Sequence, residues 1–482
     1  MLFNSIDFVL FLPLVFTLYW FVFSKNLKIQ NLLVVVVSYI FYGWWDWRFL
    51  SLIAFSTIVD FTIGNLLGKE KATSKRKLYL WTSILVNLGF LGIFKYYNFF
   101  LDSFVNAFSF FGKEISVGSL SIILPVGISF YTFQTLSYTI DIYKKQLEPT
   151  KDFIAFSAFV CFFPQLVAGP IERAANLLPQ ILKKRTFNYI QVTDGLKLIL
   201  WGFFKKVAIA DSLSPIVNDV FSNYDTASSS TLVMGAVFFA FQIYGDFSGY
   251  SDIAIGTSKL FGIELMSNFK FPYFSRNIGE FWRRWHISLS TWFRDYVYIP
   301  LGGSRGTRPQ SIRNIFIIFI VSGFWHGANW TFVVWGLLHA FLFLPSFITK
   351  TNRSFVTSIN FLTSFKDAIR NFGRVVTTFF LVTIGWVVFR SESIKHAFTY
   401  LQRMLLEFTT EVYVHPNGYR MIDYFILLLS FVAFEYIIRE NEREPFFFKN
   451  RVVRFCAYLA IIFGIILFYD DGIDRSFIYF QF

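Results

Sequence analysis

The sequence has few charged residues and few cysteines for its length. Of its 482 residues only 16% are charged, whereas 55% are hydrophobic, and the mean hydropathy is +0.51. A soluble domain carries about 25% charged residues, so this composition excludes an ordinary soluble protein and predicts an integral membrane protein. The two cysteines, Cys161 and Cys456, lie in apolar runs and give neither a zinc motif nor a disulfide framework.

Several motifs that bring cofactor chemistry are also missing. The sequence contains no G-x-x-x-x-G-K-[ST], no H-E-x-x-H and no paired C-x-x-C, which argues against a nucleotide-binding loop and a zinc site. The stretch GGSRG (302–306) matches G-x-S-x-G, but it follows no buried strand, so we interpret it as a loop. We therefore expect no metal and no tightly bound cofactor.

Long apolar runs dominate the chain and predict its architecture. A helix needs about 20 apolar residues to cross a bilayer, and we count roughly ten or eleven candidates. They predict an all-α, polytopic membrane protein with a single domain over residues 1–482, together with re-entrant and interfacial helices. The clearest candidate spans are 6–23, 31–45, 49–67, 78–97, 231–245, 312–329, 330–348, 375–390, 422–438 and 453–469. Three weaker apolar segments are 119–140, 152–168 and 195–211.

Basic residues predict the orientation of the chain. The loop KEKATSKRK (69–77) carries five basic residues and one acidic residue, which predicts a cytoplasmic position for this loop and an external N-terminus. Such loops explain the net charge of +13, so we expect membrane lipid and no nucleic acid among the partners. The segment 152–168 contains Pro164 and precedes Gly169 and Pro170, which interrupt a helix, so we expect a re-entrant half-helix that lines a cavity.

A histidine stands inside the apolar stretch SGFWHGANW (322–330). An ionisable residue at membrane depth is costly and usually functional. On one continuous helix, a single face would carry Ser322, His326, Asn329 and Trp330. Partial desolvation would keep His326 neutral and able to act as a general base. The alternative interpretation is helix packing, in which small residues allow close approach and polar residues bond across the contact.

Aromatic residues recur at helical spacing, as far as Tyr296, in the stretch EFWRRWHISLSTWFRDYVYIPLGGSRGTRP (280–309), which predicts an amphipathic helix at the membrane interface. The stripe consists of Trp282, Trp285, Leu289, Trp292, Phe293 and Tyr296. His286 lies near its edge, either as an interfacial side chain or as a second site histidine. The neighbouring arginines bind lipid headgroups or draw in an anionic group, such as a phosphate-bearing acyl carrier.

Polar residues also follow an apolar run in FQIYGDFSGYSDIAIG (241–256), where Asp246 and Asp252 stand near two glycines. This pattern predicts a broken helix with its polar groups turned inward. These groups either brace the fold or line a tunnel.

A desolvated histidine without a metal or a nucleotide loop favours group transfer. The base would take a proton from an acceptor hydroxyl, and the hydroxyl oxygen would attack an activated acyl group such as a thioester. A proton-coupled transporter or flippase uses the same kinds of intramembrane residue, so it stays open as an alternative. A structural scaffold is the third possibility.

Four stretches together resemble the membrane-bound O-acyltransferase family, in particular the bacterial branch that includes the alginate O-acetylation membrane protein. They are WRRWHISLSTWFRDYVYIPLGG, SGFWHGANWTFVVWGLLH, FFPQLVAGPIER and YGDFSGYSDIAIG. The C-terminal FIYFQF (477–482) is similar to that branch too. The resemblance spans nearly the whole chain. It implies a ring of tilted helices around a central funnel, in which acetyl-CoA or an acyl-carrier thioester reaches the site from the cytoplasm.

The resemblance also implies residues and partners. It makes His326 catalytic and His286 a second catalytic histidine. The substrate-binding candidates are Asn329, Trp285, Arg284, Asp246 and Ser322. The implied activity is O-acetyl transfer toward an extracytoplasmic polysaccharide from the cytoplasmic membrane, with an extracytoplasmic SGNH-type acetyltransferase as partner. The nearest alternative is transfer of D-alanine toward teichoic acid.

Overall fold

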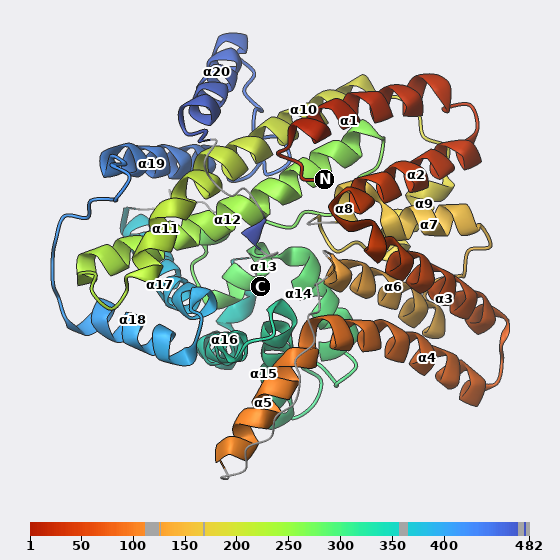
Figure 1. The fold of residues 1–482 in the computed structure, drawn as a ribbon, viewed down its shortest axis with the longest axis horizontal. Helices are drawn as coiled ribbons and strands as arrows, with labels where there is room; N and C mark the ends of the chain where they lie inside the picture. The colour runs from red at the N-terminus through yellow and green to blue at the C-terminus, as the bar shows by residue number, and fades with distance from the viewer. Residues whose placement is uncertain (111–124, 126, 167–168, 356–364, 471–476, 479–482) are drawn as a thin grey trace. The chain divides into compact units, whose positions relative to one another are not determined.

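The computed structural model is helical throughout the residues that it describes, and these contain no strand (Figure 1). The described residues are 1–110, 125, 127–166, 169–355, 365–470 and 477–478. This confirms the predicted all-α class. The chain divides into two compact units: Met1–Gly195 with Thr257–Met266, and Leu196–Gly256 with Ser267–Phe482. A single membrane domain over 1–482 stays a prediction.

The first unit is built on contacts of α3 with α6, of α2 with α7, and of α4 with both α3 and α6 (Figure 1). Its helices are α1 (Ile6–Thr17), η1 (Leu18–Val22), α2 (Leu27–Asp46), η2 (Trp47–Phe49), α3 (Leu50–Lys69), α4 (Thr73–Leu91), η3 (Gly92–Tyr96), α5 (Tyr97–Phe110), α6 (Ile128–Tyr143), α7 (Phe153–Cys161), α8 (Phe163–Leu166) and α9 (Ala174–Leu182). α10 (Tyr189–Phe203) begins in this unit and continues into the second.

The second unit contains the three stretches whose polar residues we singled out. Its helices are η4 (Phe204–Asp211), α11 (Ser212–Ser222), α12 (Ser229–Leu260), η5 (Pro272–Phe274), α13 (Ile278–Arg284), α14 (Ile287–Phe293), η6 (Arg294–Tyr298), α15 (Arg308–His326), α16 (Trp330–Ile348), η7 (Thr351–Arg353), α17 (Phe365–Arg390), α18 (Ile394–Leu406), α19 (Met421–Ile438) and α20 (Arg451–Leu467). α12 ends in the first unit. α15 and α16 lie side by side, and α16 packs on α17.

Polar side chains cap several of these helices and explain where they begin. Each capping oxygen accepts a hydrogen bond from a first-turn N–H that the helix leaves unpaired. At α15, Thr307 and Gln310 cap each other's backbone N–H reciprocally. Further helices begin after Ser5, Asn26, Asp152, Asn277, Asn329, Ser393 and Asn450.

The protein is a multi-pass membrane protein. Over the described residues, six helical segments are long and apolar enough to span a membrane: Leu27–Lys69, Thr73–Val105, Ser229–Leu260, Trp330–Ile348, Lys366–Arg390 and Met421–Ile438. Two of the predicted spans, 31–45 and 49–67, fall together in the first of these, where a single 3₁₀ turn joins α2 to α3. Two shorter apolar helical segments are Ile6–Val22 and Phe153–Leu166.

The interruption predicted in 152–168 lies at Phe162, where α7 ends and α8 begins. The ring of Pro164 would clash with the carbonyl four residues earlier in a continuous helix, so the chain must leave the helix before it. The freed N–H of Phe163 donates to Ser38 Oγ at 3.1 Å. Residues 167–168 lie outside the described residues, and the re-entrant course stays a prediction.

The break predicted in 241–256 is wrong, because α12 runs uninterrupted from Ser229 to Leu260. Its glycines serve packing instead. A Cβ on Gly249 would lie 2.8 Å from the carbonyl oxygen of Gly202, and a Cβ on Gly202 would lie 2.7 Å from that of Gly249. The two glycines therefore let α12 and α10 approach backbone to backbone.

Candidate active site

His286 lies at a break between two short helices of the second unit, outside the six candidate spans. The single interfacial helix predicted over 280–296 is wrong, because α13 ends at Arg284 and α14 begins at Ile287. The backbone of His286 has a φ of 42°, which a non-glycine residue seldom adopts. Much of the aromatic stripe faces the protein interior rather than lipid. Its buried members are Trp285, Leu289, Trp292 and Phe293.

Hydrogen bonds fix the tautomer of His286. Asn268 donates through Nδ2 to Ser251 Oγ at 3.0 Å, so its Oδ1 is the atom that faces the histidine. That oxygen lies 3.0 Å from His286 Nδ1 and also accepts from Ser288 Oγ at 2.9 Å. His286 Nδ1 must therefore carry the hydrogen and donate it, which leaves the Nε2 lone pair as an acceptor.

His286 Nε2 is buried and makes no hydrogen bond within the described part of the chain. Burial lowers the pKa of His286 to about 3, because the charged imidazolium loses its hydration. The ring is therefore neutral near pH 7. It can accept a hydrogen bond at Nε2, but it is a weak base.

His326 is the last residue of α15, and its side chain is 4% exposed. The helix ends there because Gly327 is fully extended, so the predicted helical face from Ser322 to Trp330 is wrong. Asn329 instead caps α16, where it accepts from the N–H of Thr331 and donates to the carbonyl oxygen of Glu392, both at 3.0 Å. Trp330 is 52% exposed.

The small residues of this stretch also pack helices together, as the alternative interpretation expected. A Cβ on Gly323 would collide with the carbonyl oxygen of Phe332, and one on Gly336 would collide with that of Phe319. The α15–α16 contact thus depends on both glycines. The glycine contacts and the buried His326 therefore belong to the same pair of helices.

A third buried histidine, His339 on α16, was missed by the sequence analysis. Its side chain is 0% exposed, and neither ring nitrogen has a hydrogen bond among the residues described. Gly385 makes room for it, since a Cβ there would lie 2.7 Å from His339 Nε2. The signal was present, because His339 interrupts an apolar run just as His326 does.

Tryptophan rings connect the three histidines. Trp325 lies 6.0 Å from His286 and 5.0 Å from His326, measured between ring centroids. Trp335 lies 5.1 Å from His326 and 4.8 Å from His339. The structure therefore brings both predicted histidines into one buried aromatic cluster. Within the described residues, no group of three or more histidine, cysteine, aspartate or glutamate side chains is placed to hold a metal ion.

Of the other predicted site residues, Trp285 belongs to this cluster. Its ring lies 4.7 Å from that of Trp386, and its side chain is 1% exposed. Arg284 is instead paired within the protein, since its Nη2 lies 2.9 Å from Glu280 Oε1. Arg276 binds the same carboxylate at 3.0 Å, so Arg284 stabilises a local ion-pair cluster.

Asp246 also has a bracing role. Its Oδ1 lies 2.7 Å from Lys206 Nζ, and the same ammonium group lies 2.7 Å from Asp211. Asp246 Oδ2 accepts a hydrogen bond of 2.6 Å from the N–H of Ile478. Of the two interpretations of the polar stretch on α12, these contacts favour bracing. The next residue, Phe247, lies 4.6 Å from the ring of His286.

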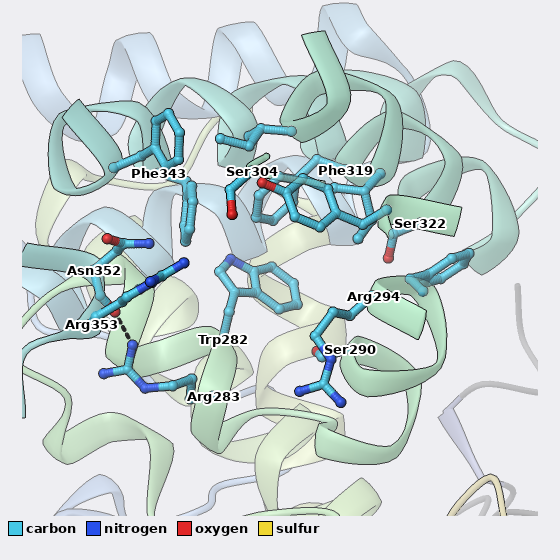
Figure 2. A pocket seen from close by; sticks show the side chains of 16 residues that line it. Trp282, Arg283, Ser290, Arg294, Ser304, Phe319, Ser322, Phe343, Asn352 and Arg353 are labelled. Atoms are coloured by element: carbon cyan, nitrogen blue, oxygen red, sulfur yellow. Dashed lines mark hydrogen bonds between the residues drawn. The ribbon is translucent and has the colours of Figure 1, made fainter. Parts of the chain in front are cut away.

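A cavity of about 340 Å³ lies beside the cluster (Figure 2). Trp282 projects into it from α13, and Ser322 lines it from α15, one helical turn before His326. The ring of Trp282 lies 5.0 Å from that of His339, so this indole touches both the cavity and the histidine cluster. Apolar side chains form much of its wall. Three arginines also line it: Arg283, Arg294 and Arg353.

Sequence comparisons agree with the resemblance. The model of the membrane-bound O-acyltransferase family matches residues 39–389. A probable alginate O-acetylase of Azotobacter vinelandii is 42% identical over 399 residues, covering 82% of this chain and 76% of that protein. The peptidoglycan O-acetyltransferase of Helicobacter pylori is 33% identical over 495 residues, covering 96% and 88%. The teichoic acid D-alanyltransferase of Bacillus subtilis is 29% identical over 287 residues, covering 56% and 70%.

Proposed function

The chain belongs to the membrane-bound O-acyltransferase family and is an O-acyltransferase, and we propose that it moves an acetyl group from a cytoplasmic thioester toward a polysaccharide hydroxyl outside the cell. The observation that carries this proposal is the buried histidine cluster beside an arginine-lined cavity. Relatives named for acetyl transfer to alginate and to peptidoglycan support the choice of group and acceptor class.

His326 is the general base in this proposal. Its imidazole takes the proton of the acceptor hydroxyl while the hydroxyl oxygen attacks the thioester carbonyl carbon. The carbon–sulfur bond then breaks, and the leaving thiolate takes the proton from His326. The products are an O-acetyl ester and a free thiol. A positioned base of this kind contributes about 10²–10⁴ in rate.

His286 orients rather than accepts the proton. Its Nε2 lone pair is available, and its ring stays neutral because of burial. A hydroxyl that donates to Nε2 would be held beside the cluster, where the Trp325 ring lies near both His286 and His326. Holding a reactant in place lowers the entropy lost in the transition state.

The cavity of Figure 2 is the proposed entry for the thioester donor. Acetyl-CoA and an acylated carrier protein share a phosphorylated pantetheine arm, which is anionic at one end and uncharged along its length. Guanidinium groups bind phosphate with paired hydrogen bonds, and the apolar wall suits the arm. The arm would pass Trp282 and His339 to reach His326.

The protein would act in the cytoplasmic membrane and hand its acetyl group to an extracytoplasmic SGNH-type acetyltransferase, which completes the transfer. Transfer of D-alanine toward teichoic acid is the second candidate, favoured by the similarity to the Bacillus subtilis enzyme over 56% of this chain. A proton-coupled transporter would leave its substrate unmodified, so detection of a new ester separates it from both.

The test is the ester-linked acetyl content of surface and secreted glycans in wild type, in a deletion strain, and in that strain carrying His326→Ala or His396→Ala. His396 is a buried histidine of α18, stacked on Tyr224 at 3.9 Å, and serves as the control. When the variants are present in the membrane in equal amounts, we expect His326→Ala to lower the acetyl content to the level of the deletion strain and His396→Ala to keep the wild-type content. If the acetyl content stays unchanged in the deletion strain, the proposed acceptor class is wrong, and D-alanyl transfer becomes the favoured function.

A further inference from the structure

A carboxyl group lies buried in the first unit, within a helix long and apolar enough to span a membrane. It belongs to Asp60 on α3, whose side chain is 0% exposed. Polar side chains of three helices surround it, although α3, α4 and α6 are otherwise largely apolar. The Asp60 site consists of Ser56, Asp60, Ser83, Asn87, Thr135 and Thr139.

Both carboxyl oxygens of Asp60 lie within hydrogen-bonding distance of uncharged groups. Ser83 Oγ lies 2.6 Å from Asp60 Oδ1. Asn87 Nδ2 donates to Asp60 Oδ2 at 2.8 Å, and Ser56 Oγ lies 3.4 Å from the same oxygen. The carboxyl group is therefore saturated by hydroxyl and amide partners.

The hydrogen bonds continue away from the carboxyl group and end on the backbone. Ser83 Oγ and Thr139 Oγ1 lie 3.0 Å apart, and Thr139 Oγ1 donates to the carbonyl oxygen of Leu136 at 3.2 Å. Thr135 Oγ1 donates to Asn87 Oδ1 at 3.2 Å. Every polar side chain of the Asp60 site thus has a partner inside it, and none of these partners carries a charge.

No lysine, arginine or histidine forms an ion pair with Asp60 in the part of the chain that the structure describes. The helices α2, α4, α6 and α7, which pack on α3, carry charged side chains only near their ends, at Lys28, Asp46, Lys75, Arg76, Lys77 and Asp141. The titratable group coupled to it is Tyr138 of α6, whose hydroxyl accepts the N–H of Thr150 at 3.2 Å. The nearby cation of α4, Arg76, bonds backbone carbonyl oxygens instead, including those of Ile142 and Tyr143.

An ionised carboxylate in such a place would have neither water nor a counter-ion. A group in this position binds a proton and becomes neutral, because the cost of burying an unpaired charge is larger than the cost of protonation. The bond network accommodates that proton without leaving a donor unused. In the ionised state Ser83 Oγ donates to Asp60 Oδ1, and on protonation this bond can reverse. The acid O–H would then donate to Ser83 Oγ, Ser83 would donate to Thr139, and Thr139 donates to the carbonyl oxygen of Leu136.

We propose that Asp60 is an intramembrane proton-binding site that joins α3 to α4 and α6. The site goes beyond the proposed acyl transfer and does not depend on it. A proton fits better than a metal cation for two reasons. The oxygen–oxygen separations of 2.6 Å and 3.0 Å are those of hydrogen bonds. Asn87 also turns its N–H₂ group toward the carboxyl, and a bound cation would repel it.

The decisive variant is Asp60→Asn, because its amide is neutral and nearly isosteric with the acid, and its N–H₂ can donate where the acid proton does. We would record infrared spectra of the purified full-length protein in lipid nanodiscs at about pH 5, where exposed aspartates are ionised, in H₂O and in D₂O. Wild type should show a protonated-carboxyl C=O band that shifts in D₂O, and Asp60→Asn should lose it. Asp102→Asn, an exposed aspartate of α5, is the matched control and should keep the band.

A second measurement follows thermal unfolding over pH. The folded state holds a proton that the unfolded chain releases as the pH rises, so wild type should lose stability with rising pH relative to Asp60→Asn. If Asp60→Asn does not fold, Ser83→Ala keeps the acid but removes its acceptor, and the band should move instead of vanishing. If Asp60→Asn removes a carboxylate band and no acid band, Asp60 is ionised in wild type, and the proposal is overturned. Stabilisation of wild type by sodium, absent in Asp60→Asn, would also overturn it and point to a cation site.

Discussion

Asn268 shows how a single side chain determines what a histidine can do. Its Oδ1 accepts hydrogen bonds from His286 and Ser288, while its Nδ2 donates to Ser251. Because that amide cannot turn without losing the bond to Ser251, His286 keeps its hydrogen on Nδ1 and presents Nε2. This assignment can be tested at Asn268 without changing either histidine.

The variant Asn268→Leu should lower acyl transfer by at least about tenfold and destabilise the fold by about 1–3 kcal/mol, because buried donors lose their acceptor. Activity in membranes and thermal unfolding of the purified protein measure the two effects. Ser288→Ala is the control, since it removes one donor to Asn268 and leaves the bond to His286 in place. Full activity of Asn268→Leu would show that the orientation of His286 does not matter.

The lowered pKa of His286 predicts how stability responds to acid. The unfolded chain takes up a proton at this histidine below about pH 6.5, whereas the folded protein does not until about pH 3. Stability should therefore fall as the pH drops through this window. His286→Gln should show a smaller loss between about pH 7 and about pH 5 in thermal unfolding. Equal losses in both proteins would mean that His286 is hydrated in the folded state.

Sequence alone could find the histidines but not their partners. His326 and His286 stand out because ionisable residues are rare in such apolar stretches. Lys206, which pairs with Asp246, lies 40 positions earlier in the chain, and nothing local to Asp246 points to it. By contrast, Glu280 lies four residues from both Arg276 and Arg284, so these two ion pairs are local in the sequence.

At the scale of the helix, apolar runs predicted where helices lie better than where they break. The runs around α2, α3, α16 and α19 became helices close to their predicted bounds. The break at His286 was not predicted, because the aromatic stripe keeps its helical spacing across it. In α12 the error was the opposite one: we predicted a break where the helix continues. A glycine beside polar residues is typical both of a helix break and of a close helix contact.

The close contact of α12 with α10 gives a test of this interpretation. Gly249→Ala should destabilise the protein by about 1–3 kcal/mol, because the added methyl group overpacks a backbone-to-backbone contact. The fraction of folded protein recovered after mild heating in detergent is a suitable measurement. Gly373→Ala on α17 is the matched control, because a Cβ there meets nothing within 4 Å. If both variants behave alike, the contact tolerates a side chain.

At the scale of the whole molecule, composition and the long apolar runs were sufficient to predict an all-α membrane protein. The orientation taken from the charge pattern stays a prediction. The count of spans is harder to obtain, because α15 and α20 are apolar helices that fall outside the six candidate spans. Hydropathy averages over a window, whereas a short helix or one with a polar face can still pass through a protein interior.

Orientation can be measured with cysteine labelling in intact cells. In a Cys456→Ser background, Ser74→Cys should resist a membrane-impermeant thiol reagent until the cells are opened, because the loop 69–77 is expected in the cytoplasm. Thr410→Cys, at an exposed position after α18, gives a second site for comparison. If Ser74→Cys is labelled in intact cells, the loop 69–77 lies outside the cell, and the predicted orientation is wrong.

The central claim is that His326 is the base in acyl transfer, and thiol release tests it most directly. We would reconstitute the purified protein in nanodiscs with a soluble oligosaccharide acceptor and the proposed SGNH-type acetyltransferase partner, and offer acetyl-CoA or an acetylated acyl carrier protein. Wild type and the control His396→Gln should release free thiol from one of these donors, and His326→Gln should release it about 10²–10⁴ times more slowly. Equal rates in wild type and His326→Gln would contradict the account.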